Sequence, residues 1–206
     1  MANDINPELR PVPILSLRPT QITVGMAEVE RKRHDWRKRG LQEDAAFLGS
    51  HLIPCVKGPK GILWVIDHHH LALALHLEGV NQVLISITAD LSKLDKRRFV
   101  TYLDNRGWCH LYDAEGEKRC FDDLPRKMTK LADDPYRSLA GEVRESGGYA
   151  KDLTPFAEFL WADFFRKRIK LKAGKALPEN AVTKALTLAH SAKAGYLPGW
   201  CGSNLD

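Results

Sequence analysis

One aspartate and three consecutive histidines, Asp67, His68, His69 and His70, form the run in this sequence that is best suited to chemistry. The run follows an apolar segment at 62–66 and precedes a segment of helical periodicity at 69–78, so we expect it at a strand-to-helix junction. The carboxylate of Asp67 can cap the N–H groups of the first helical turn, and the same N–H groups can bind a phosphate oxygen. Because a cap needs only one short side chain and imidazole carries protons near neutral pH, three histidines favour a functional role.

The histidine run is a poor zinc site. Adjacent side chains point in different directions, and no second group of ligands with metal-like spacing occurs elsewhere in the sequence. We therefore expect no metal bound directly by the protein. One histidine together with Asp67 can still help to hold a magnesium-bound phosphate.

The order of the strands and helices expected around this run predicts an α/β (α+β) protein with a small mixed sheet. Strands are expected at 12–17, 51–57, 62–66 and 82–88, with a hairpin turn at 58–61. Helices are expected at 25–39, 42–49, 69–78, 155–172 and 179–194, joined by polar and mainly helical connections after residue 90. The aromatic stripe of the helix at 155–172 is interpreted as core, and the tail from residue 195 as a loop.

The composition is that of a folded protein in the cytoplasm. Hydrophobic residues make up 44% and charged residues 28% of 206 residues, which suits one domain with a helical extension. The N-terminus has no apolar signal segment, and no apolar run approaches the length of a membrane span, so no membrane partner is expected. The four cysteines form no C-x-x-C pair and are expected to be reduced.

The net charge of +5 comes with two clusters of basic residues. A nucleic acid backbone would bind such clusters, because neutralising phosphates releases counterions. A solvated helix face explains them equally well. The residues expected to contact nucleic acid are Arg31, Arg33, Arg37, Lys38, Arg166, Lys167 and Arg168.

Residues 53–87 (IPCVKGPKGILWVIDHHHLALALHLEGVNQVLISI) resemble the central motif of the ParB/sulfiredoxin superfamily. In that motif an I-P-x-x-V strand precedes a hairpin strand, a short polar nucleotide-binding step and a helix that ends in glycine. The polar step is G-E-R-R in ParB proteins, G-C-H-R in sulfiredoxins and a D-G-H-H-R-like segment in free-serine kinases. The segments ILSLRPTQITVGMAEVERK, DDPYRSLAGEVRESGGYAKD and PFAEFLWADFFR are most similar to the putative ParB-like nuclease family. This implies a ParB/sulfiredoxin-like domain at 10–95 and a mainly helical region at 96–206 packed on it.

The resemblance implies a nucleotide site at the histidine run. The run itself and Lys57 are expected to bind the phosphates of ATP, ADP or CTP with magnesium. His68 stands where sulfiredoxins carry their catalytic cysteine, which argues against reductase activity. Leu71 stands where an arginine is expected, so His70 or Lys57 must take over its phosphate contact.

The kinase-like members of the superfamily also imply a catalytic glutamate on the first helix, and Glu28 is the matching residue. With Asp67 it would orient a nucleophile or accept its proton, while His69 or His70 carries protons. Without the resemblance, Glu28 is interpreted as an ordinary i,i+4 ion-pair partner of Lys32, which stabilises a helix by about 0.3 kcal/mol.

Three functions remain open from the sequence. The first is a ParB-like nuclease or a related phosphodiester or phosphoanhydride hydrolase that uses the basic clusters to hold nucleic acid. The second is a nucleotide-dependent small-molecule kinase, which does not need the basic surface. The third is a non-catalytic DNA-binding module gated by a nucleotide.

Overall fold

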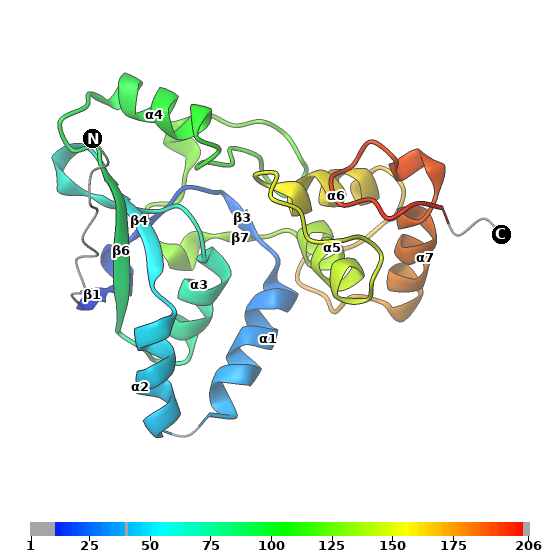
Figure 1. Ribbon diagram of the computed structural model, residues 1–206, viewed down its shortest axis with the longest axis horizontal. Helices are drawn as coiled ribbons and strands as arrows, with labels where there is room; N and C mark the ends of the chain where they lie inside the picture. The colour runs from blue at the N-terminus through cyan, green and yellow to red at the C-terminus, as the bar shows by residue number, and fades with distance from the viewer. Residues whose placement is uncertain (1–10, 40, 204–206) are drawn as a thin grey trace.

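The computed structural model describes residues 11–39 and 41–203. A mixed five-stranded sheet forms one side of the molecule (Figure 1). Its strands, in spatial order, are β1 (Pro11–Pro13), β6 (Gln82–Asp90), β4 (Ile53–Lys57), β5 (Leu63–Val65) and β2 (Arg18–Pro19). The β1–β6 and β4–β5 pairs are antiparallel, whereas β6–β4 and β5–β2 are parallel. The predicted α/β class with a mixed sheet is confirmed.

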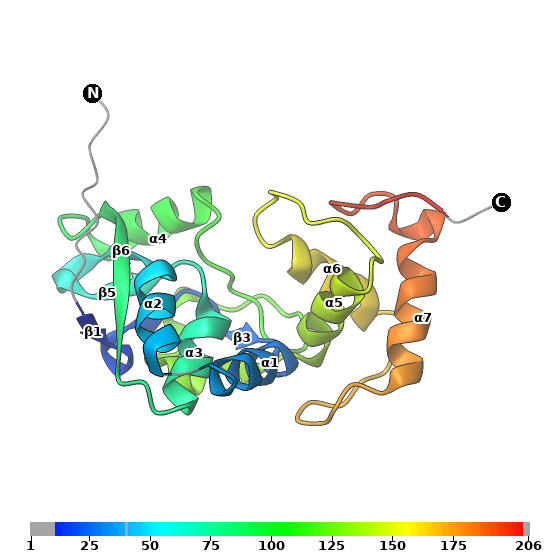
Figure 2. The same ribbon diagram turned by 60° about the horizontal axis from the view of Figure 1, so that its bottom comes forward.

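Two helices, α2 (Leu41–Ser50) and α3 (His69–Leu77), lie on one side of this sheet, and α1 (Met26–Arg37) packs on α3 (Figure 2). The first seven residues of α3 are all buried, which explains its nearly continuous apolar sequence. Gly79, with φ +82°, follows α3 at the expected stop. The predicted strand–aspartate–helix unit is therefore present.

The segment after the sheet packs back onto it. Helix α4 (Lys96–Asn105) buries Phe99 and Leu103 in one cluster with Val56 and Trp64 of the sheet. Strand β7 (Ala132–Asp133) pairs in parallel with β3 (Thr23–Val24), forming a separate two-stranded sheet. Residues on both sides of the boundary predicted at 95/96 thus share one hydrophobic cluster.

The C-terminal helices have a core of their own (Figure 1). They are α5 (Pro135–Glu145), α6 (Ala157–Arg166) and α7 (Glu179–Ala189). Leu139 and Val143 of α5 pack there with Trp161 and Phe165 of α6. The tail after residue 194 forms no regular element up to residue 203, but Leu197 is buried, and Trp161 Nε1 donates a hydrogen bond to the Pro198 carbonyl over 2.9 Å.

Three predicted elements differ from the observed ones. The strand expected at 12–17 ends at Pro13 and is followed by a 3₁₀ turn at Ile14–Ser16, because Pro13 donates no ladder hydrogen bond and the Ser16 hydroxyl donates to the Pro13 carbonyl (2.7 Å). The helix expected at 155–172 spans Ala157–Arg166 only, and the helix expected at 179–194 spans Glu179–Ala189. The hairpin turn expected at 58–61 is confirmed, since it joins the antiparallel strands β4 and β5 through a 3₁₀ turn with Lys60 at φ +61°. No helix within the described ranges is long and apolar enough to cross a membrane.

Candidate functional site

A cleft of about 500 Å³ lies where the β5–α3 junction faces α1, α5 and the start of α6. Helix α1 runs between the sheet and the C-terminal helices, so residues from both halves of the chain reach this cleft (Figure 1). The cleft brings together five of the residues predicted from the sequence: Glu28, Asp67, His68, His69 and His70.

The junction itself has an unusual backbone. His68 is the N-cap of α3 and has φ +63°, in the left-handed region that glycine adopts without strain. Such a conformation costs a residue with a side chain roughly 1 kcal/mol, and the D-G-H-H-R-like segment of free-serine kinases has glycine at the corresponding place. The Asp67 carboxylate accepts the His68 N–H over 2.6 Å, which holds the turn. The first intrahelical bond runs from Ala72 N–H to the His68 carbonyl, so the N–H groups of residues 69–71 precede the helical ladder.

Two of the three histidines are buried and bind backbone groups. Nε2 of His69 accepts the Thr20 N–H over 3.2 Å, and Nε2 of His70 accepts the Gly25 N–H over 3.0 Å. Burial lowers the pKa of both rings to about 4, so they are neutral near pH 7 and carry their proton on Nδ1. They therefore tie α3 to the segment that precedes α1. His68 is the exposed imidazole of the three, with Nδ1 3.2 Å from the Leu52 carbonyl oxygen.

Glu28 takes part in an ion-pair network that joins α1 to the C-terminal helices. Its Oε2 atom lies 3.3 Å from Nη2 of Arg137 and 3.6 Å from Nε2 of His70. Arg137 also pairs with Glu158, whose other carboxylate oxygen pairs with Arg144. The side chain of Arg137 is only 7% exposed and that of Glu28 14%, so this network lies largely out of water.

Several polar atoms of the network have no hydrogen-bond partner. Among the described residues, Glu28 Oε2 and the Nε and Nη1 atoms of Arg137 are buried without one. An unsatisfied buried polar group costs about 1–3 kcal/mol, and such groups are rare unless they serve a function. Three buried polar atoms without a hydrogen bond beside one cleft indicate a site built for a polar ligand.

The charges of this cleft are balanced in number. Its acidic residues are Glu28, Asp35, Asp67, Asp152 and Glu158, and its basic residues are Lys32, Arg39, Arg137, Arg144 and Lys151. The positive end of the α3 dipole adds to the basic side at the junction. This arrangement can bind a phosphate group at the junction and still offer carboxylates to the rest of a ligand.

Lys57, predicted to bind phosphate, does not line this cleft. It lies on β4 and pairs with Asp90 over 3.4 Å. Strand β4 pairs in parallel with β6, and this pairing places Lys57 opposite Asp90. The structure thus separates Lys57 from the histidine run.

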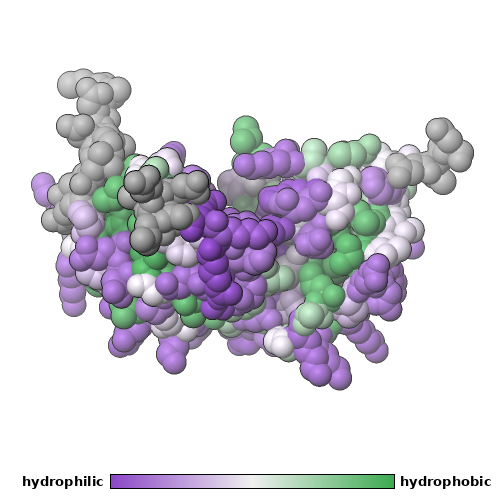
Figure 3. All heavy atoms as spheres, turned by 90° about the horizontal axis from the view of Figure 1, so that it is seen from below, coloured by the Kyte–Doolittle hydropathy of each residue, from purple (hydrophilic) through white to green (hydrophobic). Residues whose placement is uncertain are grey.

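The residues predicted to contact nucleic acid are mostly engaged within the protein. Arg33 and Arg37 both bind the Glu78 carboxylate, with atoms 2.6 Å apart. Hydrophilic side chains gather over α1 at the middle of the face seen in Figure 3. The remaining partners are Glu145 for Arg31 (3.6 Å), Asp134 for Arg166 (2.7 Å), Asp163 for Lys167 (3.1 Å) and the Phe164 ring for Arg168 (3.9 Å).

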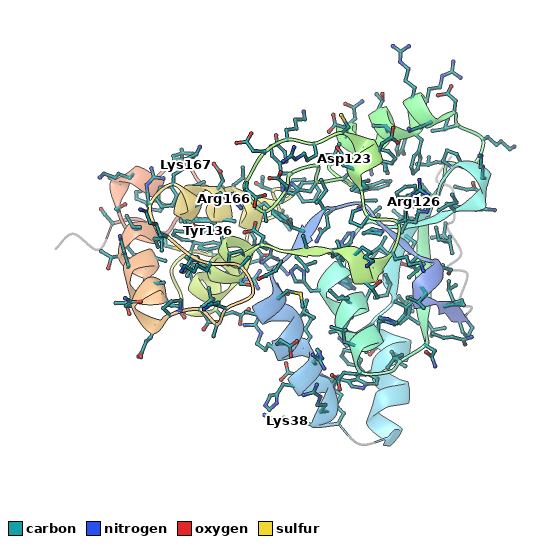
Figure 4. The ribbon with its side chains drawn as sticks, turned by 180° about the vertical axis from the view of Figure 1, so that it is seen from behind. Lys38, Asp123, Arg126, Tyr136, Arg166 and Lys167 are labelled. Atoms are coloured by element: carbon teal, nitrogen blue, oxygen red, sulfur yellow. The ribbon has the colours of Figure 1, made fainter. Side chains whose placement is uncertain are left out.

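The two basic clusters also lie apart. Figure 4 shows Lys38 at the tip of α1, at the bottom of the view, and Lys167 with Arg166 at the end of α6, in the upper part of the view. Arg166 is 14% exposed and its charge is directed at Asp134. The two clusters therefore do not form one continuous surface.

Arg137, Arg144 and Glu158 were not among the predicted site residues. Arg137 and Arg144 stand seven positions apart on α5 and so share one helix face, and Glu158 opens α6. The segments that contain them carry the family resemblance, which is the signal that points to them. The aromatic stripe of α6 is only partly core: Phe164 is buried, whereas Phe156 and Phe159 line the cleft.

Within the described ranges, no cluster of three or more His, Cys, Asp and Glu side chains is arranged to hold a metal ion. The two Arg137 donors without a hydrogen bond and the α3 N-terminus suit an anionic group such as a phosphate.

Comparison with known proteins agrees with the fold and with the sequence resemblance. The chain is similar to protein Atu1540 from Agrobacterium tumefaciens, known from a crystal structure, with 47% sequence identity and a TM-score of 0.89 over 97% of this chain and 99% of that one. None of the curated proteins compared with the chain matches it. The family model described as "Putative ParB-like nuclease" matches residues 10–167. The match spans the junction, the ion-pair network and the cleft between them, and the chain belongs to the putative ParB-like nuclease family.

Proposed function

We propose that the cleft binds the phosphates of a nucleotide and that the protein hydrolyses a phosphodiester or phosphoanhydride bond there. The observation that carries this proposal is that Glu28 Oε2 and the Nε and Nη1 donors of Arg137 make no hydrogen bond, in the same cleft as the α3 N-terminus. A base, a cation and an anion-binding helix end are the groups that phosphoryl transfer to water requires.

Each group has a role set by its position. The N–H groups of residues 69–71 bind phosphate oxygens, and Arg137 and Arg144 neutralise the charge that develops on the transferred group. Glu28 accepts the proton of the attacking water. Magnesium that arrives with the nucleotide would be held through phosphate oxygens with Asp67 as the exposed carboxylate at the junction, and it would supply charge neutralisation.

The three histidines have different roles in this proposal. His68 is exposed in the cleft and can protonate the leaving group. A proton-carrier role for His69 or His70 would require the ring to leave the backbone N–H that it accepts. These two rings position the junction against Thr20 and Gly25.

A nucleotide, or the end of a single strand, is the substrate class that the cleft favours. A volume of about 500 Å³ suits a ligand of nucleotide size. The basic residues predicted to hold a long backbone lie outside this cleft, in two clusters that do not form one continuous surface (Figure 4). An extended duplex therefore has less support than a small phosphate ester.

Transfer to a small-molecule acceptor is the second candidate function. It is favoured by the left-handed His68, which stands at the glycine of the D-G-H-H-R-like segment of the free-serine kinases. In that case Glu28 would take the proton of an acceptor hydroxyl in place of water.

The test is an activity assay with a matched pair of glutamate variants. The purified protein is incubated with ATP, ADP or CTP and magnesium, with and without single-stranded and duplex DNA, and nucleotides and DNA are followed by chromatography and gel electrophoresis. Glu28→Gln is expected to lower the rate at least 100-fold, the usual size for a lost general base. Glu30→Gln, on the same helix but 53% exposed and outside the cleft, should leave the rate unchanged.

The outcomes separate the three functions. Full activity of Glu28→Gln refutes the proposed role of this residue. Turnover that appears only when a hydroxyl-bearing acceptor is added identifies a kinase. Binding of nucleotide with both nucleotide and DNA left intact identifies a non-catalytic switch.

A further inference from the structure

A second cleft, of about 660 Å³, lies beside the first and is walled by aromatic rings. The His110 ring is at its centre, stacked on Phe159 with the ring centroids 3.8 Å apart and an interplanar angle of 29°. Tyr112 and Phe156 flank His110, each with a centroid separation of 5.0 Å. Four rings held around one cavity are a surface on which a further flat ring can stack.

The two clefts are contiguous. Phe156 and Phe159 line both of them. Thr20 connects them through the backbone, because its N–H binds His69 in the first cleft and its carbonyl accepts the His110 N–H over 2.9 Å. A ligand bound at the α3 N-terminus would therefore lie next to the aromatic rings.

The clefts differ in charge. The second contains five acidic residues and only Arg166 and Lys167 as bases; the acidic residues are Asp113, Glu115, Glu117, Asp134 and Asp163. Arg166 is already paired with Asp134. This cleft repels phosphate, whereas the first, with its helix end and its arginines, attracts it.

Backbone pairing and a closed turn hold the segment that carries Tyr112 in place. Tyr112 bridges to Lys118 in a short antiparallel ladder, and the Asp113 carboxylate accepts the N–H groups of Glu115 (3.1 Å) and Glu117 (2.8 Å), which closes the turn between them. Tyr112 is nevertheless 40% exposed. A preformed but accessible ring loses little entropy when a ligand stacks on it.

From this geometry we infer that the second cleft binds the base of the nucleotide whose phosphates occupy the first cleft. The base stacks on Tyr112 and the neighbouring rings. Its amino group donates to the carboxylates of Glu115 or Glu117 at the rim, which selects amino-bearing bases over uracil and thymine. The identity of the ligand as a nucleotide rests on the proposed function.

The experiment measures the binding of three probes to the full chain by calorimetry: ATP, tripolyphosphate and adenosine. Tyr112→Ala should weaken ATP binding about tenfold, the size expected for removing one ring from a base stack, and leave tripolyphosphate binding unchanged. Tyr112→Phe should bind ATP like the wild type, because it keeps the ring. Tyr102→Ala is the matched control, since Tyr102 is similarly exposed (37%) but lines neither cleft.

The outcomes distinguish this inference from the proposed function. Equal ATP affinity in Tyr112→Ala and the wild type, or an equal loss for ATP and tripolyphosphate, overturns the base site. Binding of adenosine that Tyr112→Ala abolishes supports it even if tripolyphosphate does not bind, a result that would count only against the phosphate site. Failure of both ATP and adenosine to bind the wild type overturns the base site, whereas tripolyphosphate binding would leave the phosphate site standing.

Discussion

Replacing Arg137 by methionine should destabilise the protein strongly, because two carboxylates depend on this side chain. Glu28 and Glu158 both pair with it, and the Arg137 side chain is only 7% exposed. Methionine fills a similar volume but carries no charge. The substitution therefore isolates the loss of the cation from the loss of packing.

The expected loss is about 3 kcal/mol in the free energy of unfolding at pH 7. Breaking a buried ion pair from one side costs roughly 3–5 kcal/mol. The lower end applies because Glu28 keeps Lys32 at 3.6 Å and Glu158 keeps Arg144. In a protein of this size, that loss corresponds to a drop in Tm of about 6–12 °C.

The assay is urea unfolding followed by circular dichroism and tryptophan fluorescence. Arg144→Met is the matched control on the same face of α5, and it should cost no more than about 1 kcal/mol, because Arg144 is 24% exposed and Glu158 keeps Arg137. In the double variant Arg137→Met/Glu28→Gln the loss should fall below the sum of the two single losses by about 1 kcal/mol or more.

Equal unfolding midpoints for Arg137→Met and the wild type would refute the reasoning. So would strict additivity in the double variant, since it would mean that Arg137 and Glu28 do not interact. A loss in Arg144→Met as large as that in Arg137→Met would show that burial does not set the energy of this network.

Three further predictions concern stability. Burial lowers the pKa of His110 from 6.5 to about 4, so between these pH values the unfolded chain binds a proton that the folded chain does not. Relative to His110→Phe, the wild type should therefore lose up to about 1.4 kcal/mol of unfolding free energy per pH unit as pH falls from 6.5 toward 4. Urea titrations at several pH values check this, and an equal pH dependence of the two proteins would contradict it. His68→Gly relieves the left-handed strain and should raise the free energy of unfolding by up to about 1 kcal/mol in thermal melts, whereas a lower Tm would mean that the imidazole contributes more than the strain costs. Gly25→Ala places a Cβ 2.8 Å from the Ser138 backbone nitrogen and should cost about 1–3 kcal/mol, while Gly49→Ala, with nothing within 4 Å, should not destabilise; similar melts for both would refute the predicted clash.

Local patterns predicted the sheet and its first helices well. The segment from 62 to 79 combines an apolar run, a polar step, helical periodicity and a terminal glycine, and each of these signals acts within a few residues. The region from 91 to 134 was predicted only as polar, mainly helical connections without bounds, because it contains 3₁₀ turns at Phe121–Asp123 and Met128–Lys130 without periodicity. Helix α4 did carry a signal, the Asp95 N-cap followed by Phe99 and Leu103 at i,i+4 spacing.

Half of the candidate site could be found from the sequence. The histidine run is conspicuous by composition, and Glu28 was reached through the family resemblance. Arg137 meets Glu28 because β3 pairs with β7, at Thr23 and Ala132, and α5 follows directly; Glu158 of α6 then pairs with Arg137. No local pattern predicts a pairing across that separation.

The basic clusters illustrate a second limit of sequence reasoning. Arg33 and Arg37 add to a count of positive charge, but their partner Glu78 lies at the end of α3. Whether a surface charge attracts a phosphate depends on partners that are distant in the sequence. The predicted nucleic acid contacts therefore stay predictions, to be judged by the DNA arm of the activity assay.

The parallel β3–β7 pair also has a consequence for how the protein folds during synthesis. Contacts between residues far apart in sequence form slowly, because the chain must close a long loop first. While residues 11–90 leave the ribosome, all five strands of the sheet are present, but Glu28 lacks Arg137 and the sheet still lacks α4. We expect the nascent chain to hold a folded sheet with an unfinished cleft until α6 emerges, so that the capacity to bind a ligand appears only after α5 and α6 have been synthesised.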